Sequence, residues 1–513
     1  MKFVSTRGGA EAVTAGQAII RGLACDGGLY VPETFPQFGE RLRELADMPY
    51  PELAFEILKP FLTDYSESEL RFAVENAYSY PINFSEPSIA PLKKFDDLNL
   101  LNENVLLNKN AGKNHENKIF FLELFHGRTQ AFKDIALSLL PHLMNAAIKR
   151  ERPGMKTVIL TATSGDTGKA ALEAFADAEN ISVVVFYPED GVSEMQKLQM
   201  ATQKGSNTCV IGVRGNFDDA QNGVKKIFGD AELSKRLNEN GAAFSSANSI
   251  NVGRLLPQVV YYYYAYFLLA KQNETKIGEQ VNFTVPTGNF GNILAGYYAM
   301  RTGLPVGKLI CASNRNNVLY DFLRSGVYDA RRRFESTISP SMDILISSNL
   351  ERLLYHLCGD GALVARLADE LKREGRYEIN YEFPNFYAAF ATEEETFAAL
   401  SETFSKGYLA DPHTAVGFHA MKKYRETSGD ETPNVIIATA SPFKFAADVL
   451  KSVSHDEKIN AGDPFGAMER LAELSGVKIP APLANLRGEA VKHDTVCEVG
   501  EMKATLINKM GWA

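Results

Sequence analysis

The sequence predicts an α/β protein with open, parallel-rich sheets flanked by helices. Strand-like apolar runs alternate with helical patterns from residue 157 onward, and such alternation is typical of parallel sheets with helices on both faces. Turns rich in glycine and hydroxyl side chains follow several of these runs, where the next helix begins. Because ligands of such sheets bind at the carboxyl ends of the strands, these turns are candidate site segments.

The 513 residues exceed what one compact core organises, so we expect more than one domain. The first part carries short helical patterns, and prolines then recur between residues 81 and 91, which is typical of a boundary. These helical patterns cover residues 40–46, 50–62 and 68–77. We therefore expect residues 1–95 to form a small N-terminal domain or an arm that wraps the rest of the chain.

Alternation of strands and helices fills the rest of the chain. The strand-like runs are residues 157–163, 183–187, 208–213, 281–285, 309–312 and 435–439, and the helical patterns between them include 168–177, 194–202, 218–237 and 253–271. We expect residues 151–274 to form a smaller α/β domain. Residues 96–150 together with 275–513 are expected to form a larger one.

Composition excludes several classes of partner. The net charge of -9 is spread along the chain, whereas a nucleic acid or an anionic membrane would require clustered basic residues. The five cysteines are scattered and never form a CxxC pair, which favours a reducing cytoplasm and offers no metal site. The chain start lacks the apolar core of a signal peptide. The most apolar run, residues 259–270, is shorter than the roughly 20 residues of a bilayer span, so we expect a buried helix there.

Lys133 lies among apolar residues at the start of a predicted helix. Phe132 precedes it, and Ile135, Leu139 and Leu140 continue an apolar stripe. A lysine that attacks an aldehyde must be uncharged, and apolar surroundings lower its pKa. A surface lysine on the first helical turn is the more common situation, so Lys133 alone decides nothing.

Two turns carry the features of anion sites. Residues 161–168, Thr-Ala-Thr-Ser-Gly-Asp-Thr-Gly, join a strand to a helix, and their hydroxyls and N–H groups suit a carboxylate or a phosphate. Asp166 is unusual there because it repels an anion, so it either points away as a cap or orients a neighbour. A plain capped turn is the alternative.

The second turn, residues 286–292, has the sequence Pro-Thr-Gly-Asn-Phe-Gly-Asn. Its two glycines let N–H groups converge on one anion at a helix start, and it is neither a Walker loop nor GxGxxG. It suits a phosphate monoester. A reactive lysine and a phosphate site on one scaffold suggest pyridoxal phosphate, and the hydroxyls that end the strand before Pro442 suit a neutral partner for the pyridine nitrogen.

With these motifs in this order, the chain resembles the threonine synthase family, pyridoxal-phosphate enzymes of fold type II. The resemblance covers nearly the whole length. The matching segments are residues 5–8, 22–32, 126–127, 132–134, 164–168, 248–251, 288–292 and 411–415, together with Thr439.

The resemblance implies roles for some of the matched residues. Lys133 would be catalytic and would hold the cofactor as a Schiff base within the larger domain. The cofactor phosphate would bind Gly288, Asn289, Phe290, Gly291 and Asn292, and Thr439 would meet the pyridine nitrogen. The substrate would bind Ser164, Gly165, Asp166, Thr167 and Asn248.

Two short segments depart from the family pattern near these motifs. Arg128 and Gln130 stand where proline and leucine are common, and Val252-Gly253 stands where tryptophan-alanine is common. Arg128 is either a ligand of a substrate phosphate or a subgroup variant. His126, His413 and Asp134 lie inside motifs without a role that the sequence defines.

The implied reaction converts O-phospho-L-homoserine and water to L-threonine and phosphate through a β,γ-unsaturated intermediate, the last step of threonine biosynthesis. We expect a cytoplasmic monomer or homodimer that uses no metal and binds neither nucleic acid nor membrane. One alternative is a related phospho-lyase that gives 2-oxobutyrate, ammonia and phosphate. Another is a pseudoenzyme that only binds the cofactor. No G-x-S-x-G motif supports a hydrolase.

Overall fold

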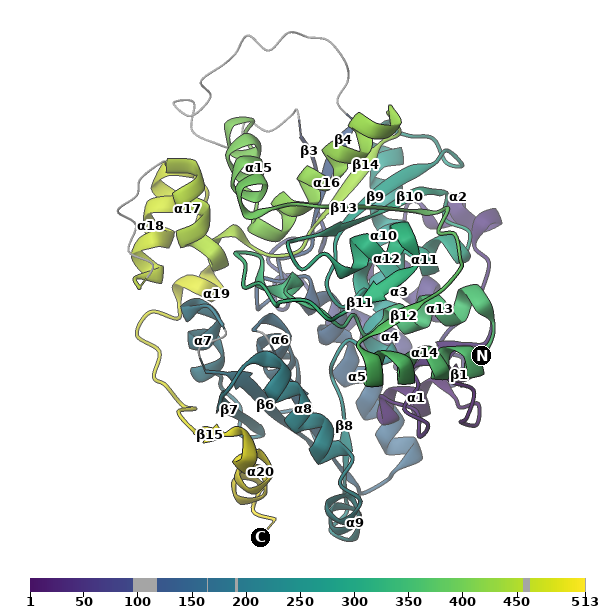
Figure 1. Ribbon diagram of the computed structural model, residues 1–513, viewed down its shortest axis with the longest axis vertical. Coiled ribbons are helices and arrows are strands. Elements are labelled where there is room, and N and C mark those ends of the chain that lie inside the picture. The colour runs from purple at the N-terminus through teal and green to yellow at the C-terminus, as the bar shows by residue number, and fades with distance from the viewer. Residues whose placement is uncertain (96–117, 164, 190–191, 455–461, 513) are drawn as a thin grey trace.

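A computed structural model describes residues 1–95, 118–163, 165–189, 192–454 and 462–512 (Figure 1). Its strands form two main sheets, and helices cover each of them (Figure 1). The larger sheet carries the start of α5, which begins with Lys133, and the smaller sheet carries the turn that contains Asp166.

The larger sheet has six described strands in the order β13-β10-β9-β14-β4-β3. All neighbours are parallel except the edge strand β3, which is antiparallel to β4. The strands are β3 (Leu92–Lys94), β4 (Ile119–Glu123), β9 (Val281–Pro286), β10 (Val306–Ser313), β13 (Phe386–Phe390) and β14 (Asn434–Ala438). β4, β9 and β14 are buried at every residue, as expected of central parallel strands covered on both faces.

Alternate residues of the central strands enter separate cores on the two faces of this sheet. Phe120 and Leu122 of β4 pack with α5 (Lys133–Glu151), α10 (Val252–Lys271) and α11 (Gly291–Arg301). Phe121 between them packs with α15 (Glu393–Ser405) and α16 (Pro412–Ser428). The predicted buried helix at residues 259–270 is confirmed within α10. Among the described residues, no helix has the length and apolar character needed to cross a bilayer.

The smaller sheet is wholly parallel, with the described order β15-β7-β6-β5-β8. Its strands are β5 (Lys156–Ala162), β6 (Ile181–Pro188), β7 (Thr208–Arg214), β8 (Ala242–Ser245) and β15 (Val496–Glu498). Its helices are α6 (Asp166–Phe175), α7 (Glu194–Ala201), α8 (Phe217–Phe228), α9 (Ala231–Glu239) and α20 (Met502–Met510). Because β15 pairs with β7, the end of the chain returns to the smaller sheet, although residues 275–513 were expected in the larger domain. The predicted domain boundaries otherwise stay a prediction.

The predicted α/β class and the six predicted strands are confirmed, at β5, β6, β7, β9, β10 and β14. The single helix predicted over residues 218–237 was wrong. The chain forms α8 and α9 instead, because Asp230 caps a new helix with its side chain, which accepts a hydrogen bond from Leu233 N at 2.9 Å.

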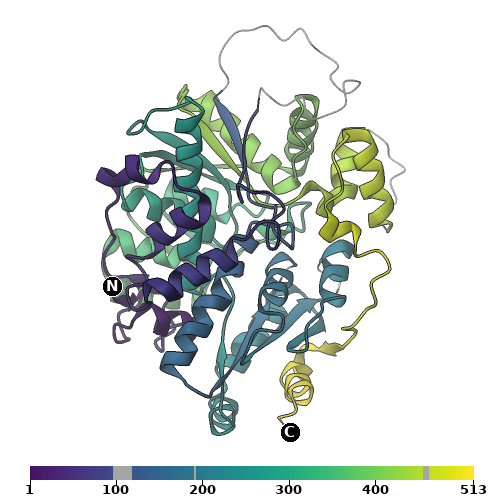
Figure 2. The ribbon, with the colours of Figure 1, turned by 180° about the vertical axis from the view of Figure 1, so that it is seen from behind.

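The first 95 residues wrap the larger unit rather than standing apart (Figure 2). Strands β1 (Phe3–Ser5) and β2 (Tyr30–Pro32) pair with each other. The short helices α1 (Ala15–Arg21) and α4 (Glu67–Ala77) pack on α5, and α3 (Tyr50–Leu58) packs on α10. The helix that begins with Lys133 is thus covered by the N-terminal segment.

Arg352 fastens this segment to the rest of the molecule. It lies in α13 (Leu350–Cys358) and is fully buried. Its guanidinium donates to the carbonyl oxygens of Tyr30 in β2, at 3.0 Å, and Ile250, at 2.6 Å, and to the side chain of Asn349. One cation therefore joins three segments that are far apart in the sequence.

We expect Arg352→Ala to lower the free energy of unfolding by about 3 kcal/mol, because it opens a cavity and leaves buried oxygens without a donor. Urea denaturation followed by circular dichroism measures this change. Arg366→Ala removes an exposed arginine paired with Glu370 and serves as the control, with a change below about 0.5 kcal/mol. Similar losses in both variants would contradict the fastening role.

Candidate active site

Main-chain pairing places Lys133 at the carboxyl end of β14. Phe132 N donates to Thr439 O at 2.8 Å, and Ser441 N donates to Gln130 O at 3.1 Å, with a bridge between Ala131 and Ala440. Lys133 then begins α5, as predicted, and is buried. The lysine and Thr439, which the sequence separates widely, are held together by the backbone.

The acidic residue after the lysine holds the loop in front of it. Asp134 accepts hydrogen bonds from Thr129 N at 2.8 Å and Thr129 Oγ1 at 2.6 Å. Gln130, one of the departures from the family pattern, donates from Nε2 to Gly127 O at 2.7 Å. Asp134 therefore has a structural task, which the sequence left undefined.

Asp166 does not cap its helix but lies between two lysines. It is the first residue of α6, after Gly165, whose φ of 130° excludes most other residues. Its Oδ1 accepts from Lys444 Nζ at 2.5 Å and from Gln196 Nε2 at 2.9 Å. Its Oδ2 lies 3.4 Å from Lys133 Nζ. Of the two alternatives for Asp166, the structure supports a side chain that orients neighbours.

The electrostatics of this group favour an uncharged Lys133. Burial lowers the pKa of Lys133, Asp166 opposes that effect, and Lys444 and Arg254 lower the pKa further. Burial also disfavours the ionised form of Asp166, but Lys444 and Lys133 outweigh it and hold the pKa of that carboxyl well below its usual range. The group therefore contains a carboxylate paired mainly with Lys444, beside an amine whose pKa is lowered.

The turn after β9 presents an open helix N-terminus. Phe290 adopts a left-handed φ of 64°, and no side chain caps α11, which starts at Gly291. The first N–H groups of a helix have no partner within it, so they face whatever lies before the helix. The backbone approaches closely at Gly288, where a Cβ atom would lie 2.8 Å from Ser341 O.

Two buried tyrosines fix Asn292 in this turn. Tyr261 and Tyr262 donate to its Oδ1 at 2.6 Å and 2.9 Å. Its Nδ2 is buried and has no hydrogen-bond partner. Such an amide donor, held in place and left free, is what an anionic group at the helix start requires.

Ser341 connects the two turns. Its Oγ lies 3.4 Å from Asp166 Oδ2, while its carbonyl meets Gly288. Its N–H donates to His413 Nε2 at 3.1 Å, and His413 Nδ1 is 2.7 Å from Asp411, the residue that caps α16. The 411–415 motif thus holds Ser341 against both halves of the site, which gives His413 a positioning task.

The other predicted residues differ in burial and in their polar partners. Asn248 is half-buried, with its Oδ1 unpartnered, and the adjacent Ser249 lies beside Gly291. Arg128 is exposed and lies 3.8 Å from Glu173. Thr167 is half-buried in α6, and Ser164 lies outside the described residues. His126 pairs with Glu123 at 2.9 Å.

Three polar residues of the site were missed by the sequence analysis. Lys444 and Gln196 hold Asp166, and Arg254 in α10 is buried with its Nε unpartnered. None of them stands in a pattern that marks chemistry. Their only sequence signal is proximity to motifs, since Arg254 follows residues 248–251 and Lys444 follows Thr439.

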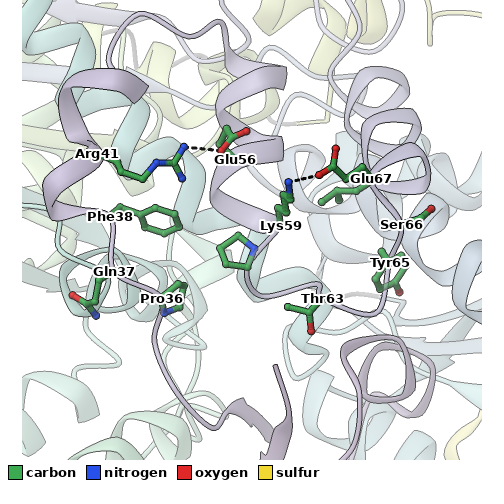
Figure 3. Close-up of a pocket in the computed structure, with 12 residues that line it drawn as sticks. Pro36, Gln37, Phe38, Arg41, Glu56, Lys59, Thr63, Tyr65, Ser66 and Glu67 are labelled. Carbon is green, nitrogen blue, oxygen red and sulfur yellow. Dashed lines mark hydrogen bonds and ion pairs between the residues drawn. The ribbon is translucent and has the colours of Figure 1, made fainter.

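A separate groove of about 590 Å³ lies in the N-terminal segment and contains none of these residues (Figure 3). Its charged side chains pair with each other, Arg41 with Glu56 at 3.0 Å and Lys59 with Glu67. The groove therefore offers no free charge to a ligand. The described residues also contain no cluster of three or more His, Cys, Asp or Glu side chains suited to a metal.

Comparison with known proteins decides the family. Residues 2–78 match the model of the threonine synthase N terminus, residues 104–375 that of pyridoxal-phosphate dependent enzymes, and residues 414–480 that of the threonine synthase C-terminal region. A threonine synthase of Pseudomonas aeruginosa is 38% identical over 461 residues, which cover 88% of this chain and 90% of that protein. The chain belongs to the threonine synthase family.

Solved and curated relatives agree with this family. The crystal structure of a pyridoxal-phosphate-bound threonine synthase from Brucella melitensis superposes with a TM-score of 0.82 at 38% identity, over 98% of each chain. Human threonine synthase-like 1 is 40% identical over 461 residues, which cover 86% of this chain but 58% of that longer protein. The family, the fold class and the class of pyridoxal-phosphate-dependent lyase predicted from the motifs are confirmed.

The residues present fit pyridoxal phosphate. The uncapped start of α11 and the free Nδ2 of Asn292 suit its phosphate, and the buried Lys133 suits its aldehyde. Lys133 is connected to the segment before α11 through Asp166, Ser341 and Gly288, which lie in contact in that order.

The pH dependence of Lys133 tests the electrostatic account. Because its pKa lies below the usual value of about 10.4, the uncharged amine is abundant at lower pH than in an ordinary lysine. We expect the rate of covalent cofactor attachment to rise with pH and to level off with a midpoint below that of an ordinary lysine. Stopped-flow absorbance measures the rate, and borohydride trapping with peptide mapping locates the adduct. Nα-acetyl-lysine is the control, and an equal midpoint would refute the account.

Asn292→Asp tests the phosphate turn. An aspartate keeps acceptors for Tyr261 and Tyr262 but replaces the free amide donor with a negative charge. We expect the dissociation constant for pyridoxal phosphate to rise at least about tenfold, the effect of one lost charge-assisted hydrogen bond. Fluorescence titration of the apoenzyme measures it. Pyridoxal without its phosphate is the matched control ligand, and an equal loss for both ligands would contradict the assignment.

Proposed function

We propose that this enzyme converts O-phospho-L-homoserine and water to L-threonine and phosphate, and that it does so in the cytoplasm. The observation that carries the proposal is a buried lysine linked through Asp166 and Ser341 to an uncapped helix N-terminus in a chain of the threonine synthase family. The scattered cysteines and the spread negative charge support the predicted location. A monomeric or homodimeric state stays a prediction.

Cofactor binding would use the start of α5 and the segments that follow β9 and β14 in the larger sheet. Lys133 would hold pyridoxal phosphate covalently, and Gly288, Asn289, Phe290, Gly291 and Asn292 would bind its phosphate. Thr439, whose carbonyl receives the N–H of Phe132, would face the pyridine nitrogen with a neutral hydroxyl. When bound, this cofactor stabilises negative charge at the substrate carbon next to the amino group.

Lys133 would then carry the protons of the reaction. Its Nζ would remove the proton from Cα and one proton from Cβ so that phosphate leaves from Cγ, and would return a proton to Cγ. Water would add at Cβ, and a proton would return to Cα to complete threonine. One base serves these steps if its pKa lies near the working pH, and burial beside Lys444 and Arg254 lowers the pKa of Lys133 in that direction.

The two anionic ends of the substrate need separate partners. The turn of residues Ser164, Gly165, Asp166 and Thr167 would receive the carboxylate at the start of α6. Arg254 is suited to the phosphate, because its Nε is a buried donor without a partner, whereas the buried atom that Asn248 leaves without a partner is the acceptor Oδ1, which suits a donor group of the substrate. Arg128, whose side chain lies near Glu173, is the remaining candidate.

Product analysis tests this function. The holoenzyme is incubated with O-phospho-L-homoserine, and threonine, phosphate, 2-oxobutyrate and ammonia are all quantified. Equal amounts of threonine and phosphate are expected, and Lys133→Ala is expected to form neither. 2-Oxobutyrate with ammonia and phosphate would identify a phospho-lyase instead. Cofactor binding without any product would identify a pseudoenzyme.

A further inference from the structure

Lys444 is a second buried lysine at the site, and it transfers no proton and binds no substrate group in the proposed reaction. It lies in η3 (Pro442–Phe445), directly after the segment that pairs with the Lys133 loop. Its side chain is completely buried. Its Nζ donates to Asp166 Oδ1 at 2.5 Å and to Thr129 O at 3.1 Å.

The position of Asp166 makes this cation necessary. Asp166 starts α6, where the helix N-terminus favours an external anion, yet its own carboxylate would repel one. It also faces Lys133, whose amine has to lose a proton to react. A lone carboxylate would oppose both requirements, since it repels the anion and stabilises a protonated amine.

We propose that Lys444 is a positioning residue that neutralises Asp166, so that Lys133 keeps an uncharged amine and the α6 turn accepts an anionic group. The part about the anionic group rests on the proposed function. The part about Lys133 concerns cofactor attachment alone.

The charged groups around the two lysines support this division of roles. Lys133 faces Asp166 from α6, Lys444 from η3 and Arg254 from α10. Lys444 also acts on Asp134, whose pKa burial raises to about 6. Asp166 contacts Lys444 more closely than Lys133, at 2.5 Å against 3.4 Å, so its charge is balanced mainly from η3.

Gln196 and Ser341 complete the surroundings of Asp166 without adding charge. Gln196 Nε2 donates to Oδ1 at 2.9 Å, and Ser341 Oγ lies 3.4 Å from Oδ2. Without Lys444, Lys133 would be the only cation within hydrogen-bond distance of Asp166 among the described residues. The carboxylate would then stabilise the protonated form of Lys133.

The test is a pH titration of the visible absorbance that appears when pyridoxal phosphate attaches to Lys133. In Lys444→Met the nitrogen of Lys133 should keep its proton to higher pH, so that the midpoint of the titration rises by about 1 pH unit. Attachment at neutral pH should slow about tenfold, which is the same change expressed as a rate. Lys444→Arg retains the charge and should stay within about twofold of the parent protein. Lys451→Met makes the same chemical change at an exposed site in α17 (Ala446–Ser454) and is the matched control.

A double-variant cycle shows whether Lys444 acts through Asp166. In the presence of Asp166→Asn, adding Lys444→Met should leave the midpoint unchanged, because no carboxylate remains to be neutralised. An equal shift with and without Asp166→Asn would overturn the proposal, as would a Lys444→Met titration identical to that of the parent. If Lys444→Met fails to fold, the double variant removes both charges, and a midpoint for it that differs from that of Asp166→Asn alone would overturn the proposal.

Kinetics with O-phospho-L-homoserine test the part about the anion. Lys444→Met should raise KM at least about tenfold, and adding Asp166→Asn should restore KM to within about threefold. A KM that stays at the parent value in Lys444→Met would overturn this part. If the parent protein makes no threonine, the proposed function fails while the absorbance titration still reports on Lys444.

Discussion

One carboxylate shared by two buried lysines organises this site. Asp166 holds Lys444 closely and Lys133 more loosely, and each of the three comes from a different element. Buried charges are tolerated only when they are paired and hydrogen-bonded, so the three elements must meet with good geometry for the protein to fold. The interactions of Asp166 therefore fix α6 of the smaller sheet relative to α5 and η3.

Backbone pairing and supporting side chains position the reactive groups of the site. Pairing of residues 130–132 with residues 439–441 fixes where α5 begins, and Asp134 holds the preceding loop through Thr129. On the other side, Tyr261 and Tyr262 hold Asn292, and His413 holds Ser341 against Gly288. Most residues of the family motifs thus support neighbours, which keeps the few reactive groups in a defined geometry.

The sequence was most informative where pattern and chemistry coincide. Continuous apolar runs revealed the central strands, and glycine-rich turns after them marked the two segments that Ser341 connects, because both signals are local. Short strands such as β8 and β15 have too few residues to show a period, and the break between α8 and α9 depends on the cap that Asp230 provides. Lys444 could not be foreseen, since its partner Asp166 lies 278 residues away and only the folded chain brings them together.

The order of strands in the larger sheet has a consequence for synthesis on the ribosome. β4 is made early, but its neighbour β14 comes more than 300 residues later, and the segment that fixes Lys133 follows β14. The nascent chain therefore carries an ordinary solvated lysine until most of it has emerged. The buried surroundings that lower the pKa of this lysine, which include Lys444 after β14, are therefore completed only near the end of synthesis.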